Sequence, residues 1–474
     1  MSAKKRDVVI LGAGLAGLSA GHVLTRAGVP LEVLEAGHDV GGLARTIEHE
    51  GFRFDLGGHR FLTSNKAVET FVSDLLGNRI LDAPRKSKIL LRSRYFDYPL
   101  KPANALFGLG VPCTLRLLAG YCVQKLKTHF GPGRPAVSLE DWVVARFGRP
   151  MFDLYFRDYS EKVWGLPSSE ISAEWVAKRI AGLSLWEAVK NAFWKQSGTD
   201  IATLADRFLY PPLGIGRISE RLRQAIEWRN PVRTDTRVVR VDHDRGTIKR
   251  IMVRSKEEVR DIEPGQIVST IPLTGLVRML HPAPPEAVRE AAKGLRFRDL
   301  IVVAVMLDRD RVNDLSWMYL PEKKITLGRI HEPKNWSPCM APEGKTHLVA
   351  EYFCFRGDAV WNASDEELAD RTAEQLSGLG LFKRDEVIGS RVVRVPRAYP
   401  VLDIGYRGRH EKIMEYLSGF KNLHVAGRGG TFQYLNMDHA IESGMDAATA
   451  ILEKSLAGQQ CMRTEADQFV ETNS

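Results

Sequence analysis

Apolar and polar positions at the start of the chain predict a strand, a helix and a second strand. Asp7–Leu11 is a short β-branched apolar run, typical of a parallel strand that is buried on both faces. Residues 18–27 follow with helical spacing and end at Gly28, after which residues 31–34 form a second apolar run. This order predicts a βαβ unit within the first thirty-five residues.

Later segments predict more of the same sheet and two inserted regions. Residues 236–242 and 267–272 read as strands, residues 423–430 as a strand that runs into a glycine turn, and residues 438–452 have helical spacing. Between them, residues 139–147 and 171–185 favour helices, whereas residues 300–307 and 347–352 favour strands. We therefore expect an α/β protein with one helical insert and one insert that mixes strands and helices.

A glycine pattern joins the first predicted strand to the helix. Gly12, Gly14 and Gly17 form G-x-G-x-x-G, and Glu35 ends the second strand. The first glycine permits a tight turn, the second lets the backbone approach a pyrophosphate, and the third lets helix and strand pack closely. The helix N-terminus faces the phosphate charge, and the acid accepts hydrogen bonds from ribose hydroxyls. The sequence therefore predicts a dinucleotide site, which also includes Ala16 and Ala36.

The segment after Glu35 favours FAD over NAD. It contains Gly41-Gly42-Leu43-Ala44-Arg45 and then Gly57-Gly58-His59, and it resembles the extended flavin fingerprint of the amine oxidase and protoporphyrinogen oxidase superfamily. Glycine backbone near phosphate, an arginine donor and a chain without Cβ atoms beside the flat flavin ring all suit that cofactor. No cysteine or histidine stands out as a covalent attachment point, so we expect non-covalent FAD. The predicted cofactor-binding residues are Gly12, Gly14, Ala16, Gly17, Glu35, Ala36, Gly42, Leu43, Arg45, Gly57, Gly58, His59, Val238, Gly427, Arg428 and Met437.

Composition narrows the class of protein. A chain of 474 residues is too long for one core, and its 44% hydrophobic and 26% charged residues fit an ordinary soluble globular enzyme. The formal charge of +9 is spread along the chain and no nucleic-acid module is visible, so we expect no nucleic-acid partner. Five cysteines without a C-x-x-C pair argue against a disulfide framework and a zinc site, so no metal is expected.

The termini and the most apolar stretch predict the location. The chain leads directly into the first strand, which leaves no room for a signal peptide, so we expect a cytoplasmic protein. Residues 106–126 are apolar but are interrupted by Pro112, Arg116 and Gln124, which makes them too broken to span a bilayer. We expect a helix buried in a substrate lobe here. A helix that lies on a membrane surface is the alternative.

A second series of motifs sharpens the resemblance. The series matches, in order, the UDP-galactopyranose mutases over residues 8–451, closest to the eukaryotic type. This resemblance implies a Rossmann-like, glutathione reductase-type FAD-binding domain made of residues 1–99, 206–275 and 396–455. It also implies a helical substrate lobe over 100–205, a sheet-containing lobe over 276–395 and a polar tail over 456–474. The motifs are Gly57–Phe61, Asp97–Leu100, Tyr159–Pro167, Trp175–Arg179, Trp317–Pro321, Arg329, Tyr399-Pro400, Gly427-Arg428, Tyr434 and Asn436–His439.

The resemblance also implies roles for single residues. Arginines matching Arg179 and Arg329 clamp a substrate diphosphate, tyrosines matching Tyr319 and Tyr434 contact the same group, and the Asn436 position lies beside the flavin and the sugar. Guanidinium groups bind diphosphates in a bidentate way, which supports the same assignment. His59 is a further candidate against the flavin. Lys101 and the segment 429–432 depart from the family pattern and leave the nucleotide base and the sugar open.

Two functions remain at this point. The resemblance implies a pyranose–furanose mutase that acts on a nucleotide-diphosphate sugar, with N5 of the reduced flavin as nucleophile and NAD(P)H as a candidate reductant. The alternative is an FAD-dependent oxidoreductase, like an amine oxidase or protoporphyrinogen oxidase, with a hydrophobic substrate. An oxidase of neutral or cationic substrates has little use for two arginines at its flavin. The sequence leaves the oligomeric state open.

Overall fold

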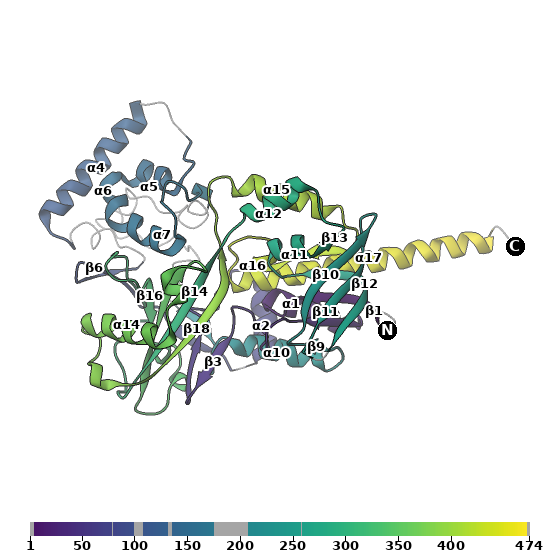
Figure 1. Cartoon of the computed structure of the whole chain (residues 1–474), viewed down its shortest axis with the longest axis horizontal. Helices are drawn as coiled ribbons and strands as arrows, with labels where there is room; N and C mark the ends of the chain where they lie inside the picture. Colours follow the sequence, from purple (N-terminus) through teal and green to yellow (C-terminus); the bar gives the residue numbers. More distant parts are fainter. Residues whose placement is uncertain are drawn as a thin grey trace.

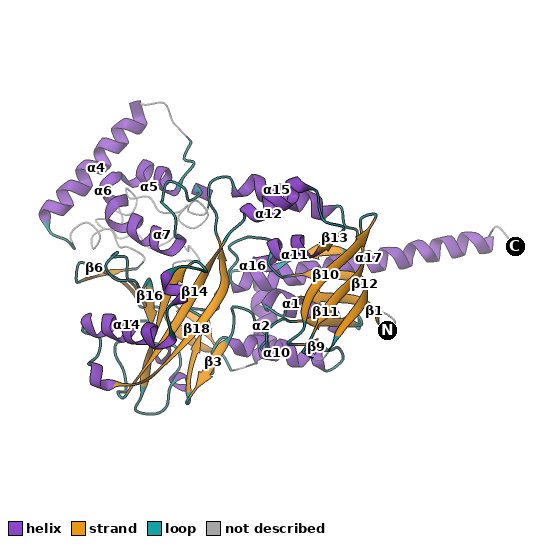
Figure 2. Ribbon diagram, in the orientation of Figure 1, coloured by secondary structure: helices purple, strands orange, loops and turns teal. Residues whose placement is uncertain are grey.

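The structure is a computed structural model of the whole chain (Figures 1 and 2). It describes residues 4–77, 79–98, 108–130, 135–174, 207–256 and 258–471, and of residues 455–471 only the backbone.

The predicted βαβ unit is confirmed and forms the centre of an eight-stranded sheet. Strand β1 (Lys4–Leu11) pairs in parallel with β2 (Leu31–Leu34) on one side and with β12 (Val259–Ser269) on the other, and helix α1 (Leu15–Arg26) connects the first two. The strand order is β13-β10-β11-β12-β1-β2-β9, with β19 paired in parallel to β12. The other strands are β9 (Val232–Arg233), β10 (Arg237–Asp244), β11 (Thr247–Arg254), β13 (Leu280–His281) and β19 (Leu423–Val425).

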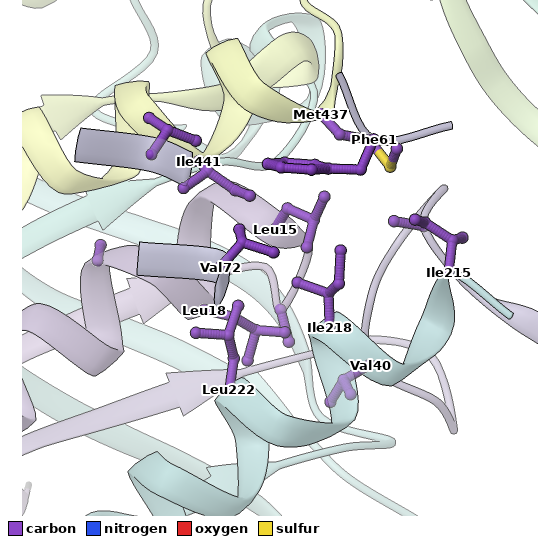
Figure 3. Packing of buried hydrophobic residues seen from close by; sticks show 14 of the residues in the cluster. Leu15, Leu18, Val40, Phe61, Val72, Ile215, Ile218, Leu222, Met437 and Ile441 are labelled. Carbon is purple, nitrogen blue, oxygen red and sulfur yellow. The ribbon is translucent and has the colours of Figure 1, made fainter. Parts of the chain in front are cut away.

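Helices cover both faces of this sheet, which completes the α/β architecture. On one face α1 packs with α2 (Lys66–Leu76), α10 (Gly216–Glu227) and α17 (Met437–Glu471), through a buried cluster that contains Leu18, Ile218 and Ile441 (Figure 3). The other face carries α11 (Leu273–Met279), α12 (Glu286–Gly294) and α15 (Tyr406–Ser418), packed on Val9, Leu11 and neighbouring strand residues. Strands that are buried on both faces explain the continuous apolar runs in the sequence.

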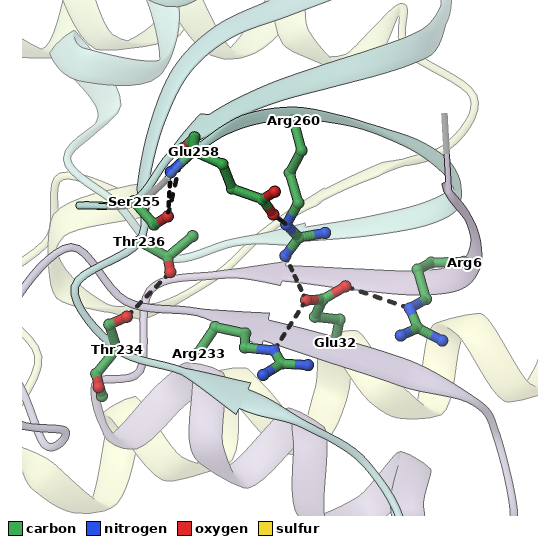
Figure 4. Close-up of polar contacts among 8 residues, drawn as sticks. All are labelled: Arg6, Glu32, Arg233, Thr234, Thr236, Ser255, Glu258 and Arg260. Atoms are coloured by element: carbon green, nitrogen blue, oxygen red, sulfur yellow. Dashed lines mark hydrogen bonds and ion pairs between the residues drawn. The ribbon is translucent and has the colours of Figure 1, made fainter. Parts of the chain in front are cut away.

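A buried carboxylate joins four strands of this sheet. Glu32 of β2 is 1% exposed and pairs with Arg6 of β1, Arg233 of β9 and Arg260 of β12 (Figure 4). Burial alone would raise the pKa of Glu32, but hydrogen bonds and charges from Arg260 and Arg6 lower it overall. The carboxylate therefore stays ionised at neutral pH, and it links strands that are far apart in the sequence.

A seven-stranded sheet lies beside the first, in the order β18-β14-β17-β16-β15-β6-β7. Its centre is β14 (Phe297–Leu307), antiparallel to β17 (Thr346–Cys354) and β18 (Val387–Pro400). Helix α14 (Asp365–Gly378) covers one face, and the ribbon of β3 (Thr46–His49) and β4 (Phe52–Asp55) packs on the other. Strands β6 and β7 pair with this sheet, although their residues belong to the first segment of the proposed cofactor domain. The remaining strands are β6 (Ser87–Leu91), β7 (Arg94–Asp97), β15 (Trp317–Tyr319) and β16 (Arg329–His331).

A helical lobe adjoins this sheet (Figure 1). It consists of α4 (Val111–Phe130), α5 (Leu139–Phe147), α6 (Arg149–Met151), the π-helical turn Phe152–Phe156 and α7 (Arg157–Trp164). The expectation that the apolar stretch is buried here is wrong, because only Thr114 and Leu117 of α4 are buried. Its sequence places apolar residues on both sides of the helix, whereas the lobe contacts only one side. No helix among the described residues has the length and apolar character to cross a membrane.

The chain ends in a long helix. The polar segment that the sequence predicts as a tail continues α17 as far as Glu471, and this end projects from the body (Figure 1). The short β5 (Leu81–Pro84) and β8 (Arg207–Tyr210) form a separate two-stranded ribbon.

Candidate active site

The glycines between β1 and α1 form an open cradle. Gly12 has φ +100°, and a Cβ on Gly17 would lie 2.0 Å from the carbonyl oxygen of Gly12, so neither position accepts a side chain without strain. In contrast, a Cβ on Gly14 would meet nothing within 4 Å. The cradle therefore has free space where a pyrophosphate would approach the start of α1, which fits the predicted dinucleotide.

The acid at the end of β2 lies beside this cradle. Glu35 accepts hydrogen bonds from the backbone N–H groups of Ala13 (2.9 Å) and Gly37 (2.8 Å), so its carboxylate is held in position. The amide N–H of Thr236 donates to the Glu35 carbonyl oxygen at 2.8 Å, which brings the segment leading to Val238 next to it. Ala36 is exposed at the same edge. A carboxylate with unused lone pairs at this place suits ribose hydroxyls.

The predicted phosphate loop lies against the cradle as well. Gly14 and Gly41 form a parallel bridge, and a Cβ on Gly42 would lie 3.3 Å from the Gly14 Cα. Arg45 donates from Nε to the Gly42 carbonyl oxygen at 3.0 Å and pairs with Asp39 at 3.6 Å. Leu43 packs on the core that lies under β4. Arg45 is thus near the phosphate position, with one partner in its own loop.

The C-terminal segment packs against the glycine cradle. Gly427 has φ +75°, and a Cβ there would lie 2.8 Å from the Ala16 Cβ, while a Cβ on Gly444 would lie 2.0 Å from the Ala16 carbonyl oxygen. These close approaches place α17, about two turns after its start, on the start of α1, and Met437 is buried in the same core (Figure 3). The C-terminal segment therefore borders the N-terminus of α1, where the helix dipole suits an anionic flavin nucleotide.

Gly57 and Gly58 lie against an ion pair. A Cβ on Gly57 would lie 3.4 Å from the Glu351 carboxylate, and one on Gly58 would lie 3.3 Å from the Arg329 guanidinium carbon. The Gly58 N–H donates to Glu351 at 3.1 Å. The predicted reason for these glycines was passage beside a flavin ring. The structure adds a second reason, because Gly57 has φ +112° and a Cβ on Gly58 would crowd the Arg329 guanidinium.

Arg329 and Glu351 are direct cross-strand neighbours of β16 and β17. Two parallel hydrogen bonds of 2.7 and 2.6 Å join the guanidinium to the carboxylate, and Glu351 is fully buried. Burial lowers the pKa of Arg329, but the Glu351 charge and hydrogen bonds more than compensate and raise it. The guanidinium therefore remains charged, and its two hydrogen bonds to Glu351 use only its Nε and Nη2 atoms.

Two groups of aromatic rings border Arg329. Tyr319 contacts Tyr98 at 4.5 Å and Tyr159 at 5.4 Å between ring centroids. Tyr434 stacks on Tyr399 at 5.6 Å and meets Trp164 of α7 edge-on at 6.0 Å. Burial raises the pKa of Tyr159, Tyr319 and Tyr399, so these hydroxyls stay protonated and can act as donors.

Two further arginines face the same place, and sequence reasoning missed both. The Arg60 guanidinium lies over the Trp317 ring at 5.0 Å, and Arg85 lies over the rings of Trp317 and Tyr98 at 5.6 Å each. Burial, and then the Arg85 charge, lower the pKa of Arg60 to about 10. Among the described residues, no carboxylate pairs with Arg60. Arg60 belongs to the Gly57–Phe61 motif, which could have revealed it; no pattern marks Arg85 or Glu351.

The remaining predicted residues lie around this group. His59 has a buried Nδ1 without a hydrogen-bond partner among the described residues, and burial, with Arg428 and Arg329, lowers its pKa to about 3. Arg428 donates to the Leu435 carbonyl oxygen and lies over Tyr434 at 5.0 Å, so it holds the loop before α17. Asn436 caps that helix through its carbonyl oxygen. Arg179 and Lys101 lie outside the described residues.

Taken together, the sheet, the glycine cradle and the closing helix define a dinucleotide-binding α/β protein. A sequence profile of the NAD(P)-binding Rossmann-like domain matches residues 10–75. The profile of flavin containing amine oxidoreductase matches residues 122–452, more than half of the chain. The chain therefore belongs to the flavin-containing amine oxidoreductase family. It is a flavin-dependent enzyme, FAD is the cofactor that the family implies, and the predicted superfamily is confirmed.

Similar proteins include both classes that the sequence left open. The fold matches reduced UDP-galactopyranose mutase with a TM-score of 0.82 at 23% identity, over 94% of this chain and 96% of that one. It matches a putative protoporphyrinogen oxidase from Exiguobacterium sp. 255-15 with a TM-score of 0.73 at 19% identity, over 96% and 100%. L-amino acid oxidase Cdc18 of Crotalus durissus cumanensis is 40% identical over 72 residues, 15% of this chain. That match spans only 14% of the oxidase.

Proposed function

We propose that this enzyme binds a nucleotide-diphosphate sugar and catalyses a mutase-type isomerisation of its ring. The observation that supports this proposal is the charge of the site. Arg60, Arg85 and Arg329 gather beside the Gly57-Gly58 loop, and Glu351 is the carboxylate that pairs with Arg329. The Arg60 guanidinium pairs with no carboxylate among the described residues and lies over an aromatic ring. A charge in such surroundings favours an anion, and a diphosphate has charge enough to balance it.

Each part of the site has a task in this function. The cradle residues Gly14 and Gly42 and the acid Glu35 would hold FAD, which when reduced supplies a nucleophilic nitrogen. Arg329 and Arg60 would bind the diphosphate and keep it in place while the sugar is detached. Tyr319 and Tyr434 would donate hydrogen bonds without adding charge. The pKa of His59 is low, so this ring stays neutral beside the arginines and does not add to their repulsion.

An FAD-dependent oxidoreductase is the second candidate. Its support is the family itself and the short match to L-amino acid oxidases. The stacked pair of Tyr399 and Tyr434 would offer such an enzyme an apolar surface for its substrate. The two functions differ in the charge of the group that meets the arginines. The arginines would repel an amine, whereas they would attract a carboxylate or a diphosphate.

The test is an anaerobic titration of the flavin-loaded protein after reduction with dithionite. UDP, GDP, dTDP and CDP are added in turn while flavin absorbance and fluorescence are followed. We expect a saturable response to one diphosphate. Arg60→Gln should weaken that response at least tenfold and leave flavin content unchanged, because no carboxylate of the described residues pairs with Arg60 and would lose its partner. Arg254→Gln, at an exposed position of β11, is the matched control and should change nothing.

The possible results separate the two functions. No response to any diphosphate from a protein with intact flavin would refute the diphosphate site and leave the oxidoreductase. In that case L-amino acids and amines are tested as reductants of the oxidised flavin. A response that Arg60→Gln and Arg254→Gln alter equally would show that the ligand binds elsewhere.

A further inference from the structure

Helix α4 presents an apolar stripe to solvent. Six large apolar side chains of this one helix are at least 36% exposed, and Phe130 is 80% exposed. With 3.6 residues per turn, most of them fall on one side, opposite Thr114, Leu117 and Gly120, which face the lobe. The stripe consists of Val111, Leu115, Leu118, Val123, Leu126 and Phe130.

The charges of α4 are all of one sign. Arg116, Lys125 and Lys127 flank the apolar stripe, and the helix sequence contains no acidic residue. None of the three cations forms an ion pair with any residue that the structure describes. The contact of α4 with the lobe is close and leaves the stripe on the outside: a Cβ on Gly120 would lie 2.5 Å from Pro150. An apolar face with an uncompensated basic border needs an apolar partner that also carries negative charge.

We propose that α4 lies on the surface of an anionic lipid bilayer, with its stripe in the headgroup region. The combination of apolar side chains at the centre and lysine or arginine at the border is what such a surface recognises. A second copy of this face is a poor occupant, because it would bring like charges together. The formal charge of +9 of the whole chain favours the same surface. This inference goes beyond the proposed function, since it concerns where the enzyme works and not which substrate it takes.

The test is co-sedimentation of the flavin-loaded full-length protein with two kinds of vesicle. One kind is phosphatidylcholine alone, and the other is phosphatidylcholine with an equal part of phosphatidylglycerol. We expect binding to the anionic vesicles, weaker binding at high salt and little binding to the neutral ones. Leu115→Gln with Leu126→Gln should reduce the partition coefficient at least about tenfold for each substitution, because each removes an apolar side chain that the bilayer would bury. Lys125→Gln with Lys127→Gln should reduce it about 25-fold in total, at about fivefold for each charge.

Matched controls keep the test specific to α4. Val259→Gln with Ile388→Gln removes apolar side chains that are 54% and 44% exposed elsewhere, and Lys249→Gln with Lys412→Gln removes charges at other exposed sites. Neither control should change vesicle binding, and flavin absorbance reports folding of every variant. Equal binding to both vesicles, no binding, or equal losses in α4 variants and controls would overturn the proposal. A dimer in solution that the α4 variants abolish would also overturn it.

Discussion

Two buried carboxylates of this enzyme are surrounded by arginines, and their surroundings differ. Glu32 lies in the first sheet and pairs with three arginines, of which Arg6 and Arg260 are 20% and 22% exposed and Arg233 is 55% exposed. Glu351 lies in the second sheet, and its partner Arg329 is 18% exposed. Each arginine at Glu32 has this carboxylate as a partner, and solvent screens the charge of the exposed Arg233, so this cluster can serve the sheet alone.

Near Glu351, by contrast, the charge of Arg60 is balanced by no carboxylate of the described residues. Arg60 and Arg85 lie over aromatic rings near Arg329, and burial and mutual repulsion lower the pKa of Arg60 to about 10. In a place of low effective dielectric constant, such repulsion is strong and an anionic ligand relieves it. The comparison teaches that a count of arginines around a carboxylate does not distinguish a structural cluster from a binding site. What distinguishes them is whether every arginine of the cluster pairs with a carboxylate.

The largest expected effect comes from removing the two carboxylate charges. Glu351→Gln should lower the free energy of unfolding by about 3–5 kcal/mol, because Arg329 is left buried without a countercharge. Glu32→Gln should lower it by about 1 kcal/mol, because Arg233 is 55% exposed and Arg260 keeps a second carboxylate, Glu258. Urea denaturation of the flavin-free proteins at pH 7 measures both. Equal losses would contradict the comparison.

The next prediction compares one arginine-to-methionine substitution at each cluster, and the expected changes in stability have opposite signs. Arg60→Met removes a repelled charge but keeps an apolar side chain against Trp317, so we expect the flavin-free protein to become about 2 kcal/mol more stable. Arg6→Met breaks a hydrogen bond to Glu32 and should cost about 1 kcal/mol. Thermal unfolding in a buffer without phosphate or sulfate measures this, since bound anions would compensate the charge of Arg60. Destabilisation by both substitutions would show that Arg60 already has a countercharge.

The sequence predicted the cradle well because its parts are close together in the chain. Gly12, Gly14, Gly17 and Glu35 lie within one βαβ unit, whose geometry is local and leaves a regular spacing. Resemblance then added Arg329, Tyr319 and Tyr434. The sequence also showed that the α4 segment is apolar. It did not show which side of this helix the lobe would cover.

The rest of the site depends on contacts between distant segments. Arg329 meets Glu351 only because β16 and β17 pair in one register, and Arg85 reaches Trp317 because β6 joins β15 from far along the chain. Register between strands is set by the whole sheet and leaves no spacing in the sequence. Glu351, which holds both Arg329 and the Gly58 N–H, could therefore not be predicted.

A fall in pH should lower the free energy of unfolding through His59, which lies near Arg329 in the second cluster. This side chain binds a proton at its ordinary pKa of 6.5 when unfolded, but only near 3 when folded. Between these values the folded protein binds fewer protons, so its stability falls as the pH falls below 6.5. From pH 6.5 to 5 the loss due to His59 is about 2 kcal/mol.

The measurement is the free energy of unfolding against pH for the wild type and His59→Gln. The variant should lose about 2 kcal/mol less over this interval, since other histidines of low pKa, such as His347, contribute equally to both proteins. Glu32→Gln should leave this slope unchanged, because the pKa of Glu32 is lowered and lies below the interval. Identical slopes for wild type and His59→Gln would show that His59 is protonated in the folded state or reaches water.

The smallest effect concerns salt and uses a double-mutant cycle at each cluster. Arg233 is 55% exposed and 3.5 Å from Glu32, so its coupling to Glu32 should be about 0.5 kcal/mol at 0.1 M NaCl. At 1 M NaCl the screening length shrinks from about 10 Å to about 3 Å, and this coupling should vanish. The coupling between Arg329 and Glu351 should stay above about 2 kcal/mol at both concentrations, because salt cannot enter between groups joined by two hydrogen bonds in a buried place. A salt-sensitive Arg329–Glu351 coupling would mean that water reaches the guanidinium, and the charge argument for an anion site would then fail.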